Sequence, residues 1–126
     1  MTEPKPVEFL GNTKEELSAM PLVVKREIGR ALWAAQMGER HKDAKPLKEF
    51  GGASVMEIVS DHDTNTYRGV YTVRFAGVVY VLHVFQKKSK RGSEVPRADM
   101  NVIRQRFQVA EATHTQRLAR ERTGQE

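Results

Sequence analysis

Three strand-like stretches in the middle of the chain constrain the fold most. They are rich in β-branched and aromatic residues and span 54–60, 66–75 and 78–86. Only Ala76 and Gly77 separate the second stretch from the third, which predicts a tight antiparallel hairpin. We therefore expect a small antiparallel sheet at the centre of the molecule.

Helical patterns precede these strands. Thr13 and Glu16 have the spacing of a capping box, so a short helix should begin at Thr13. Pro21 can open a second helix that stops at Gly38. Its apolar residues recur at three- and four-residue steps and are Val24, Ile28, Ala31, Leu32 and Ala35. Trp33 lies off the centre of this stripe, and we expect it to cover the edge of the sheet.

A third helix is predicted from Pro96 to about Arg120, and residues 38–52 form a polar connector. The fold class is therefore α+β: a small antiparallel sheet, two N-terminal helices and a C-terminal helix. We expect the helices to pack on one face of the sheet and to leave the other face open. With 126 residues, the chain should form one domain, with 1–10 and 120–126 flexible.

Several classes of protein are excluded or disfavoured by residue types. The chain has no cysteine, which rules out disulfides, thiol nucleophiles and cysteine-ligated metals. Its four histidines never stand at the i, i+4 spacing of a helical metal site, so a metal site is disfavoured. The longest apolar stretch, residues 77–85, is too short to cross a bilayer, so we expect a cytoplasmic protein with no membrane partner.

The positive charge is concentrated in one window. Residues 1–85 carry 11 basic and 11 acidic groups, whereas residues 86–106 carry seven basic and two acidic groups, a net charge of +5. Such a window attracts a polyanion, most commonly nucleic acid. A solvated basic loop is the other interpretation.

The predicted hairpin determines which side chains share a face. If Ala76 and Gly77 form the turn, Arg68 lies opposite Phe85, and Val70 lies opposite His83. One face then carries Arg68, Val70, Thr72, Arg74, Val79, Val81, His83, Phe85 and Lys87, and the other carries Tyr67, Tyr71, Val73, Tyr80 and Leu82. Arginine and lysine side chains on the first, positively charged face are suited to bind phosphate, and such a cluster could cleave RNA without metal, which the spacing alone does not establish. For His83, a structural role as a half-buried strand histidine is favoured over a catalytic one.

Several motifs in this order resemble the phage-derived HigB-like toxins of the RelE/ParE superfamily, over roughly residues 8 to 110. The motifs are Leu17 with Met20-Pro21, Leu47 with Lys45 and Lys48, Val55-Met56-Glu57-Ile58, Thr66-Tyr67-Arg68-Gly69-Val70-Tyr71, Tyr80-Val81-Leu82-His83-Val84-Phe85-Gln86-Lys87-Lys88-Ser89, and Pro96. The resemblance implies the toxin of a type II toxin–antitoxin system. Such toxins are mRNA interferases that cut mRNA at the ribosome, need no cofactor and are silenced by a helix-turn-helix antitoxin.

The resemblance also implies site residues. Arg68 matches a strand arginine that stabilises the transition-state phosphate, and Lys87 and Lys88 match a basic pair of which one residue is catalytic. The hairpin register favours Lys87, the motif alignment favours Lys88, and a bulge at Gln86 would reverse the choice. Further RNA-binding residues are expected to be Lys45, Lys48, Arg74, His83, Lys90 and Arg91.

The sequence does not identify the residue that acts as general base. The first strand lacks the lysines that relatives closest to RelE carry there, which leaves Glu57 and His62 as acid/base candidates. Glu57 is expected first of all as a structural partner of Arg68 or Arg74. Two other functions also remain open: a non-nucleolytic ParE-like toxin that binds a protein target such as DNA gyrase, and a phage RNA-binding module without catalysis.

Overall fold

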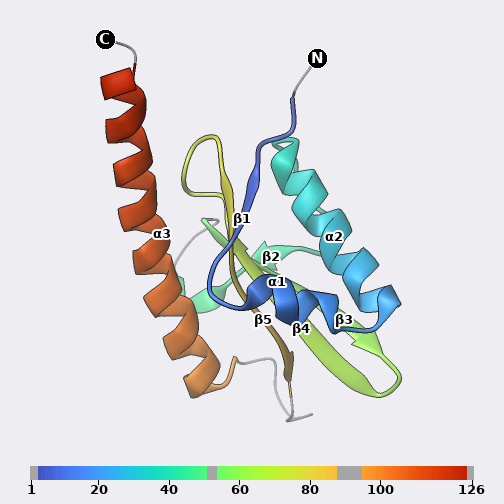
Figure 1. Cartoon of the computed structure of the whole chain (residues 1–126). Helices are drawn as coiled ribbons and strands as arrows, with labels where there is room; N and C mark the ends of the chain where they lie inside the picture. Colours follow the sequence, from blue (N-terminus) through green and yellow to red (C-terminus); the bar gives the residue numbers. More distant parts are fainter. Residues whose placement is uncertain (1–2, 51–53, 88–94, 125–126) are drawn as a thin grey trace.

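The structure is a computed structural model that describes residues 3–50, 54–87 and 95–124 (Figure 1). It contains five strands, three α-helices and one short 3₁₀ helix in those ranges. In chain order they are β1 (Val7–Phe9), α1 (Thr13–Ser18), α2 (Leu22–Gln36), β2 (Lys45–Pro46), η1 (Lys48–Phe50), β3 (Val55–His62), β4 (Asn65–Thr72), β5 (Val79–Lys87) and α3 (Arg97–Gly124).

The strands form one five-stranded sheet in the order β1-β5-β4-β3-β2. The three predicted strands lie at its centre and pair antiparallel, so the α+β class is confirmed. Two strands were not predicted: β1, which pairs parallel with β5, and β2, which pairs antiparallel with β3 inside the expected connector. They have three and two residues, too few for an alternating pattern to be recognised.

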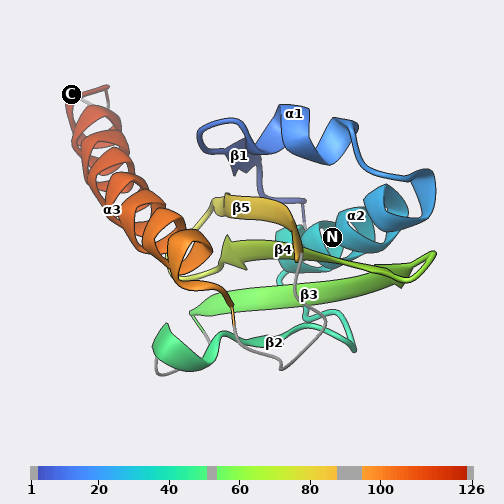
Figure 2. The same cartoon turned by 90° about the horizontal axis from the view of Figure 1, so that it is seen from below.

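Helices cover both faces of the sheet, and the expectation of an open face is wrong. Figure 1 and Figure 2 show α2 on one side of the strands and α3 on the other. On the α2 face, residues such as Ile28 and Leu32 pack against Met56 and Ile58. On the α3 face, Met100, Ile103 and Ala110 pack into a second core with strand residues that include Val70, Leu82 and Phe85. Because α3 has an apolar side of its own, it needs a sheet face to bury it.

The predicted register is correct over most of the β4–β5 hairpin and then shifts. Arg68 pairs with Phe85 and Val70 with His83, as expected, but Tyr71 pairs with Val81. Leu82 is therefore an extra residue in β5, a β-bulge. The bulge exchanges the sheet faces on which the first residues of β5 lie. Val79 and Val81 belong to the α2 core, and Tyr80 and Leu82 belong to the α3 core, which is the opposite of the prediction.

The hairpin turn is also looser than expected. β4 ends at Thr72 and β5 begins at Val79, so residues 73–78 form a loop in place of a two-residue connection. Within it, the Val78 amide donates to the Phe75 carbonyl at 3.4 Å, and Gly77 has a φ of +84°. Glycine adopts this left-handed conformation without steric cost, which explains its position in the turn.

The N-terminal helices lie where the sequence predicts them, with two differences. Helix α1 begins at Thr13, but its N-cap is Asn12, whose side-chain amide donates to the Glu16 carboxylate at 3.2 Å. Helix α2 buries all five predicted apolar residues. Trp33 does not cover the sheet edge, since it is 55% exposed on the outer side of α2.

Helix α3 is the longest element, with 28 residues. Its buried residues end at His114, and the turns that follow are mostly exposed. Figure 1 shows these C-terminal turns rising beside the β4–β5 loop. No helix in the described ranges is long and apolar enough to span a membrane.

Two glycine substitutions test the packing of α2 on the sheet. A Cβ at Gly69 would stand 3.1 Å from Cγ2 of Ile28, whereas a Cβ at Gly29 in α2 would meet nothing within 4 Å. We expect Gly69→Ala to lower the free energy of unfolding by about 1–3 kcal/mol because it overpacks this contact. Gly29→Ala should raise it by up to about 1 kcal/mol through helix propensity. Urea unfolding of both variants measures the difference, and equal effects would contradict the close approach at Gly69.

Candidate active site on the α3 face of the sheet

Three rows of side chains cross the sheet on the face that α3 covers. The strand registers and the alternation of side chains define them. The first row contains Lys45, Glu57, Val70 and His83; the second contains Val59, Arg68 and Phe85; the third contains Asp61, Thr66 and Lys87. Ionisable and aromatic groups from four strands are thereby brought together, and we call this region the α3-face site.

A buried ion pair occupies the centre of this site. Nη1 of Arg68 donates to Oε2 of Glu57 at 2.9 Å, and the two residues are only 4% and 7% exposed. The predicted partnership of Glu57 with Arg68 is thus confirmed. Nε of Arg68 is buried and has no hydrogen-bond partner among the described residues. Thr13, Tyr80 and His114 also have a buried side-chain atom without such a partner, and a water or a ligand commonly completes the bonding of atoms of this kind.

Lys87 lies on the same face as Arg68. It pairs with Thr66 and is diagonal to Arg68, in a register that runs unbroken from Val70–His83 to Thr66–Lys87. The register therefore has no bulge at Gln86, and the bulge lies at Leu82 instead. Lys87 is 7% exposed and takes part in interactions of its own. The other candidate cations of this segment, Lys88, Lys90 and Arg91, lie outside the described residues.

His83 is held between an acidic and a basic side chain. Its Nε2 lies 2.7 Å from Oδ1 of Asp99, and its Nδ1 lies 3.5 Å from Nη1 of Arg106. These partners assign the tautomer, with the proton on Nε2 and the lone pair on Nδ1. The ring also stacks on Phe85, with centroids 4.6 Å apart. Burial lowers the pKa of His83, and the hydrogen bond that its Nε2–H donates to Asp99 opposes this effect only in part, which favours the neutral ring at pH 7.

Two cavities open beside the rows. The larger, about 670 Å³, borders β5, α1 and the start of α3, and is lined by Asn12, Glu16, His83, Val84, Phe85, Gln86, Pro96 and Asp99. The smaller, about 210 Å³, is lined by Lys45, Pro46, Leu47, Lys48, Glu49, Glu57 and Val95. Lys45 and Lys48 are exposed there. The Glu57–Arg68 pair therefore has a cavity beside its carboxylate, and a second cavity adjoins Phe85, which pairs with Arg68.

The remaining predicted site residues lie apart from this group. Arg74 follows the end of β4 in an exposed position, so it does not extend the rows. His62 pairs with Asn65 at the tip of the β3–β4 hairpin, and strand alternation puts it on the α2 face, opposite Arg68. Any role of these two residues in binding or acid–base chemistry stays a prediction.

Carboxylates balance part of the charge that the sequence places on this face. Glu57 neutralises Arg68, Asp61 accepts a hydrogen bond from Thr66 at 2.8 Å in the third row, and Asp99 bonds His83. The expected open cationic surface is therefore covered and partly neutralised in the described chain. The reason is electrostatic, because a buried guanidinium needs a paired anion to offset the loss of its hydration.

Sequence reasoning missed Asp99 and Arg106. Arg106 donates from Nη1 to the carbonyl of Leu82 at 3.0 Å and from Nη2 to Oδ1 of Asn12 at 3.1 Å, so it joins α3, β5 and the start of α1. Both residues lie in the window 86–106, for which the sequence shows a net positive charge but no contacts between side chains. Only the packing direction of α3 reveals their partners.

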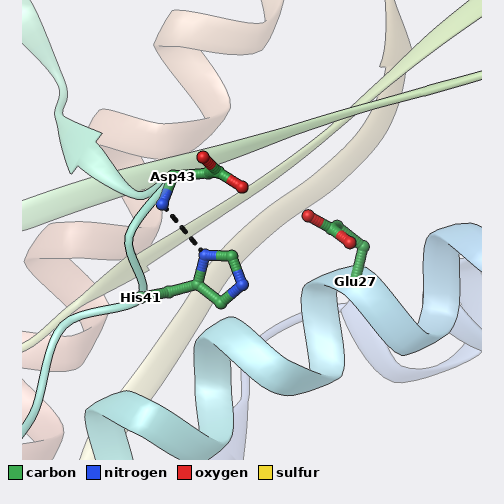
Figure 3. A group of neighbouring side chains, drawn as sticks. All are labelled: Glu27, His41 and Asp43. Atoms are coloured by element: carbon green, nitrogen blue, oxygen red, sulfur yellow. Dashed lines mark hydrogen bonds between the residues drawn. The ribbon is translucent and has the colours of Figure 1, made fainter.

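One group of potential metal ligands exists among the described residues, away from the α3-face site. Glu27 on α2 and His41 and Asp43 in the following loop point toward one another, with ligand atoms within 4.8 Å (Figure 3). Nδ1 of His41 accepts a hydrogen bond from the Asp43 amide at 3.1 Å, which puts the proton of the neutral ring on Nε2. Neither nitrogen then offers a free lone pair, and the geometry is that of a hydrogen-bonded turn.

Comparison with known proteins gives one match. The model of a family described as phage derived protein Gp49-like (DUF891) matches residues 15–108, more than half of the chain. Every residue of the three rows lies within that range, and so do Asp99 and Arg106. No curated protein and no solved structure matches the chain.

The buried ion pair makes a stability prediction. Glu57→Gln leaves the Arg68 guanidinium buried without a counter-charge, and we expect it to lower the free energy of unfolding by about 3–5 kcal/mol. The double substitution Glu57→Leu with Arg68→Met removes both charges and should recover most of that loss. Urea unfolding measures both variants. A loss below about 1 kcal/mol for Glu57→Gln would contradict the burial of the pair.

His83 makes a prediction about pH. Because its pKa is lowered from 6.5 in the folded chain, the unfolded chain takes up this proton first as the pH falls. The stability that neutral His83 contributes is therefore complete above the unfolded pKa and is lost as the pH falls through it toward the folded pKa. We expect urea midpoints to fall less steeply with acidification in His83→Gln than in the wild type. Arg120→Gln, at an exposed position of α3 that carries no histidine, is the control and should follow the wild type; parallel curves for all three proteins would refute the assignment.

Proposed function

The chain belongs to the Gp49-like family of phage-derived proteins, a toxin-like family related to the RelE/ParE superfamily, and from this premise we propose that it is a metal-independent endoribonuclease. In this proposal it is the toxin of a type II toxin–antitoxin system, acts on mRNA at the ribosome in the cytoplasm and is silenced by a helix-turn-helix antitoxin. One observation carries the enzymatic part: Arg68, with its orphaned Nε–H, shares a face with Lys87 and with the neutral His83 beside a cavity of about 670 Å³.

The proposed reaction is transfer of the phosphodiester to the neighbouring 2′-oxygen. A base removes the proton of the 2′-hydroxyl, and the 2′-oxygen forms a bond to phosphorus. The bond from phosphorus to the 5′-oxygen then breaks, and an acid returns a proton to that oxygen. The products are a 2′,3′-cyclic phosphate and a 5′-hydroxyl. Cations on the protein stabilise the charge of the pentavalent phosphorane, so the step balances without a metal.

We assign the phosphate to Arg68 and Lys87. A guanidinium offers several N–H donors in a plane that matches phosphate oxygens, and the unused Nε–H of Arg68 is available for one of them. Lys87 adds a second positive charge from the neighbouring strand. We keep Lys88 as the alternative to Lys87, since the motif alignment favours it.

We assign the proton transfer to His83. Glu57 is bound to Arg68, and His62 lies on the other face, whereas His83 lines the larger cavity. His83 would accept the proton at Nδ1, so Arg106, which lies 3.5 Å from that atom in the resting state, has to withdraw when substrate binds, and Asp99 stabilises the imidazolium once it forms. A neutral histidine with an orienting carboxylate is suited to accept a proton near pH 7.

Access to Arg68 requires movement. The side chain is 4% exposed in the isolated chain, so a phosphate can reach it only when the groups around it separate. We include this opening in the proposal and assign it to the binding of mRNA on the ribosome. Differential contacts that favour the open state would supply the free energy for it.

Expression in bacteria tests the proposal. The wild type should arrest growth and produce RNA fragments with 5′-hydroxyl ends, and purified protein with ribosomes should cleave mRNA in excess EDTA. We expect Lys87→Met and the charge-free Glu57→Leu/Arg68→Met variant to reduce cleavage by about 10²–10³-fold. Arg120→Ala, on the exposed end of α3, is the control with full activity.

Two outcomes would reject this function. The first is full toxicity of the folded Glu57→Leu/Arg68→Met protein. The second is intact mRNA together with accumulating cleaved gyrase–DNA complexes, which is the result expected of a ParE-like toxin. RNA binding that weakens with salt but gives no cyclic phosphate would instead identify a binding module.

A further inference from the structure

Exposed apolar side chains concentrate on the outer side of α2. Leu22, Val23 and Trp33 are 57%, 52% and 55% exposed, and they account for three of the six large hydrophobic residues exposed in the described chain. The opposite side of the same helix is buried against the sheet. The folding of α2 onto the sheet therefore leaves a second apolar side without cover.

Two arginines complete this side of α2. Leu22, Arg26 and Trp33 are separated by four and seven residues, so they stand above one another on a helix, and Val23 and Arg30 form a neighbouring row at a seven-residue step. Arg26 and Arg30 are exposed. Neither forms an ion pair within the described part of the chain. We call this set of five residues the α2 stripe.

We propose that the α2 stripe is a docking surface for an acidic amphipathic helix of another protein. Leu22 and Val23 at the start of α2 and Trp33 about three turns further on lie on the same side of the helix, and a helix lying alongside can contact such positions with its own apolar anchors. Tryptophan and arginine are the residues that contribute most to protein interfaces. The surface is independent of the proposed catalysis because α2 and the α3-face site lie on opposite faces of the sheet (Figure 2).

The positive charge of the α2 stripe favours an acidic helix over two other partners, a second copy of the chain and an anionic membrane. A second copy of the chain would bring its own Arg26 and Arg30 against the same arginines, and like charges at an interface repel. An anionic membrane would favour a helix whose polar flanks are wholly basic, whereas Glu27 lies on the flank of this stripe. Carboxylates at fixed positions on a helix match two guanidinium groups at fixed positions, with paired hydrogen bonds.

Tryptophan fluorescence can monitor binding at this surface, because Trp33 is the single tryptophan of the chain. The probe is a helical peptide of about 18 residues without tryptophan or tyrosine, with leucines at alternating three- and four-residue steps and glutamates on the flanks. A matched peptide carries lysine at every glutamate position. We expect the acidic peptide to shift Trp33 emission to shorter wavelength in a saturable way, and the lysine peptide to leave it unchanged.

Charge reversal supplies the decisive variant. Arg26→Glu with Arg30→Glu should weaken binding of the acidic peptide at least about tenfold and should create binding of the lysine peptide. The matched control is Arg120→Glu with Arg122→Glu on the exposed end of α3, which should bind the acidic peptide as the wild type does. Circular dichroism and the urea midpoint verify that both variants fold.

Three results would overturn the proposal. One is no emission shift, or equal shifts with both peptides and both variants. Another is a shift only with vesicles of phosphatidylglycerol and phosphatidylcholine, which would identify a membrane surface. The last is sedimentation that depends on protein concentration and is abolished by Trp33→Ala, which would identify a second copy of the chain. Cleavage of mRNA is unaffected by any of these outcomes, so the two proposals fail separately.

Discussion

The extra residue at Leu82 in β5 determines how the two cores and the α3-face site are assembled. Without it, Tyr80 and Leu82 would face α2, but the bulge turns them into the core that α3 covers. A bulge leaves backbone groups out of the strand ladder, and here Arg106 binds the freed carbonyl of Leu82. The same guanidinium rests over Gly11, where a Cβ would approach to 2.6 Å. The bulge, α3 and the start of α1 are thus stabilised by one side chain, which also lies beside His83.

The sequence predicts those parts of the fold in which polar and apolar residues follow one another in a recognisable pattern. Arg68 and His83 mark the register of the β4–β5 hairpin because they interrupt apolar strands, and the stripe of α2 is visible because charged residues flank it. Residues 78–82 are all apolar, so a shift of one residue there exchanges one hydrophobic side chain for another. The bulge is therefore invisible in the sequence, and with it the face that each of these residues occupies. The packing of α3 on the second face of the sheet could not be predicted for a similar reason. The sequence shows that α3 has an apolar side, but it does not show which face of the sheet this side packs against.

Only part of the candidate site could be predicted from the sequence, and neither its burial nor its cover by α3 could be. The positions of Arg68 and Lys87 on one face follow from strand alternation, and family resemblance points to the same two residues. The sequence predicts one pairing, that of Glu57 with Arg68 or Arg74, but it does not predict that Asp99 in α3 reaches His83 in β5. The sequence therefore predicts an exposed cationic patch, whereas in the folded chain these side chains are largely buried and several of them are paired.

A closed group of paired charges is not explained by its contribution to stability. The Glu57–Arg68 pair is costly to bury, and apolar residues of similar size can replace such pairs without loss of stability. Stability alone therefore does not account for a buried arginine at this position. A substrate phosphate would compete with Glu57 for the guanidinium and complete the missing hydrogen bond, so the pair would hold Arg68 ready for RNA. The α2 stripe lies on the opposite face, where a partner can bind without passing through this site.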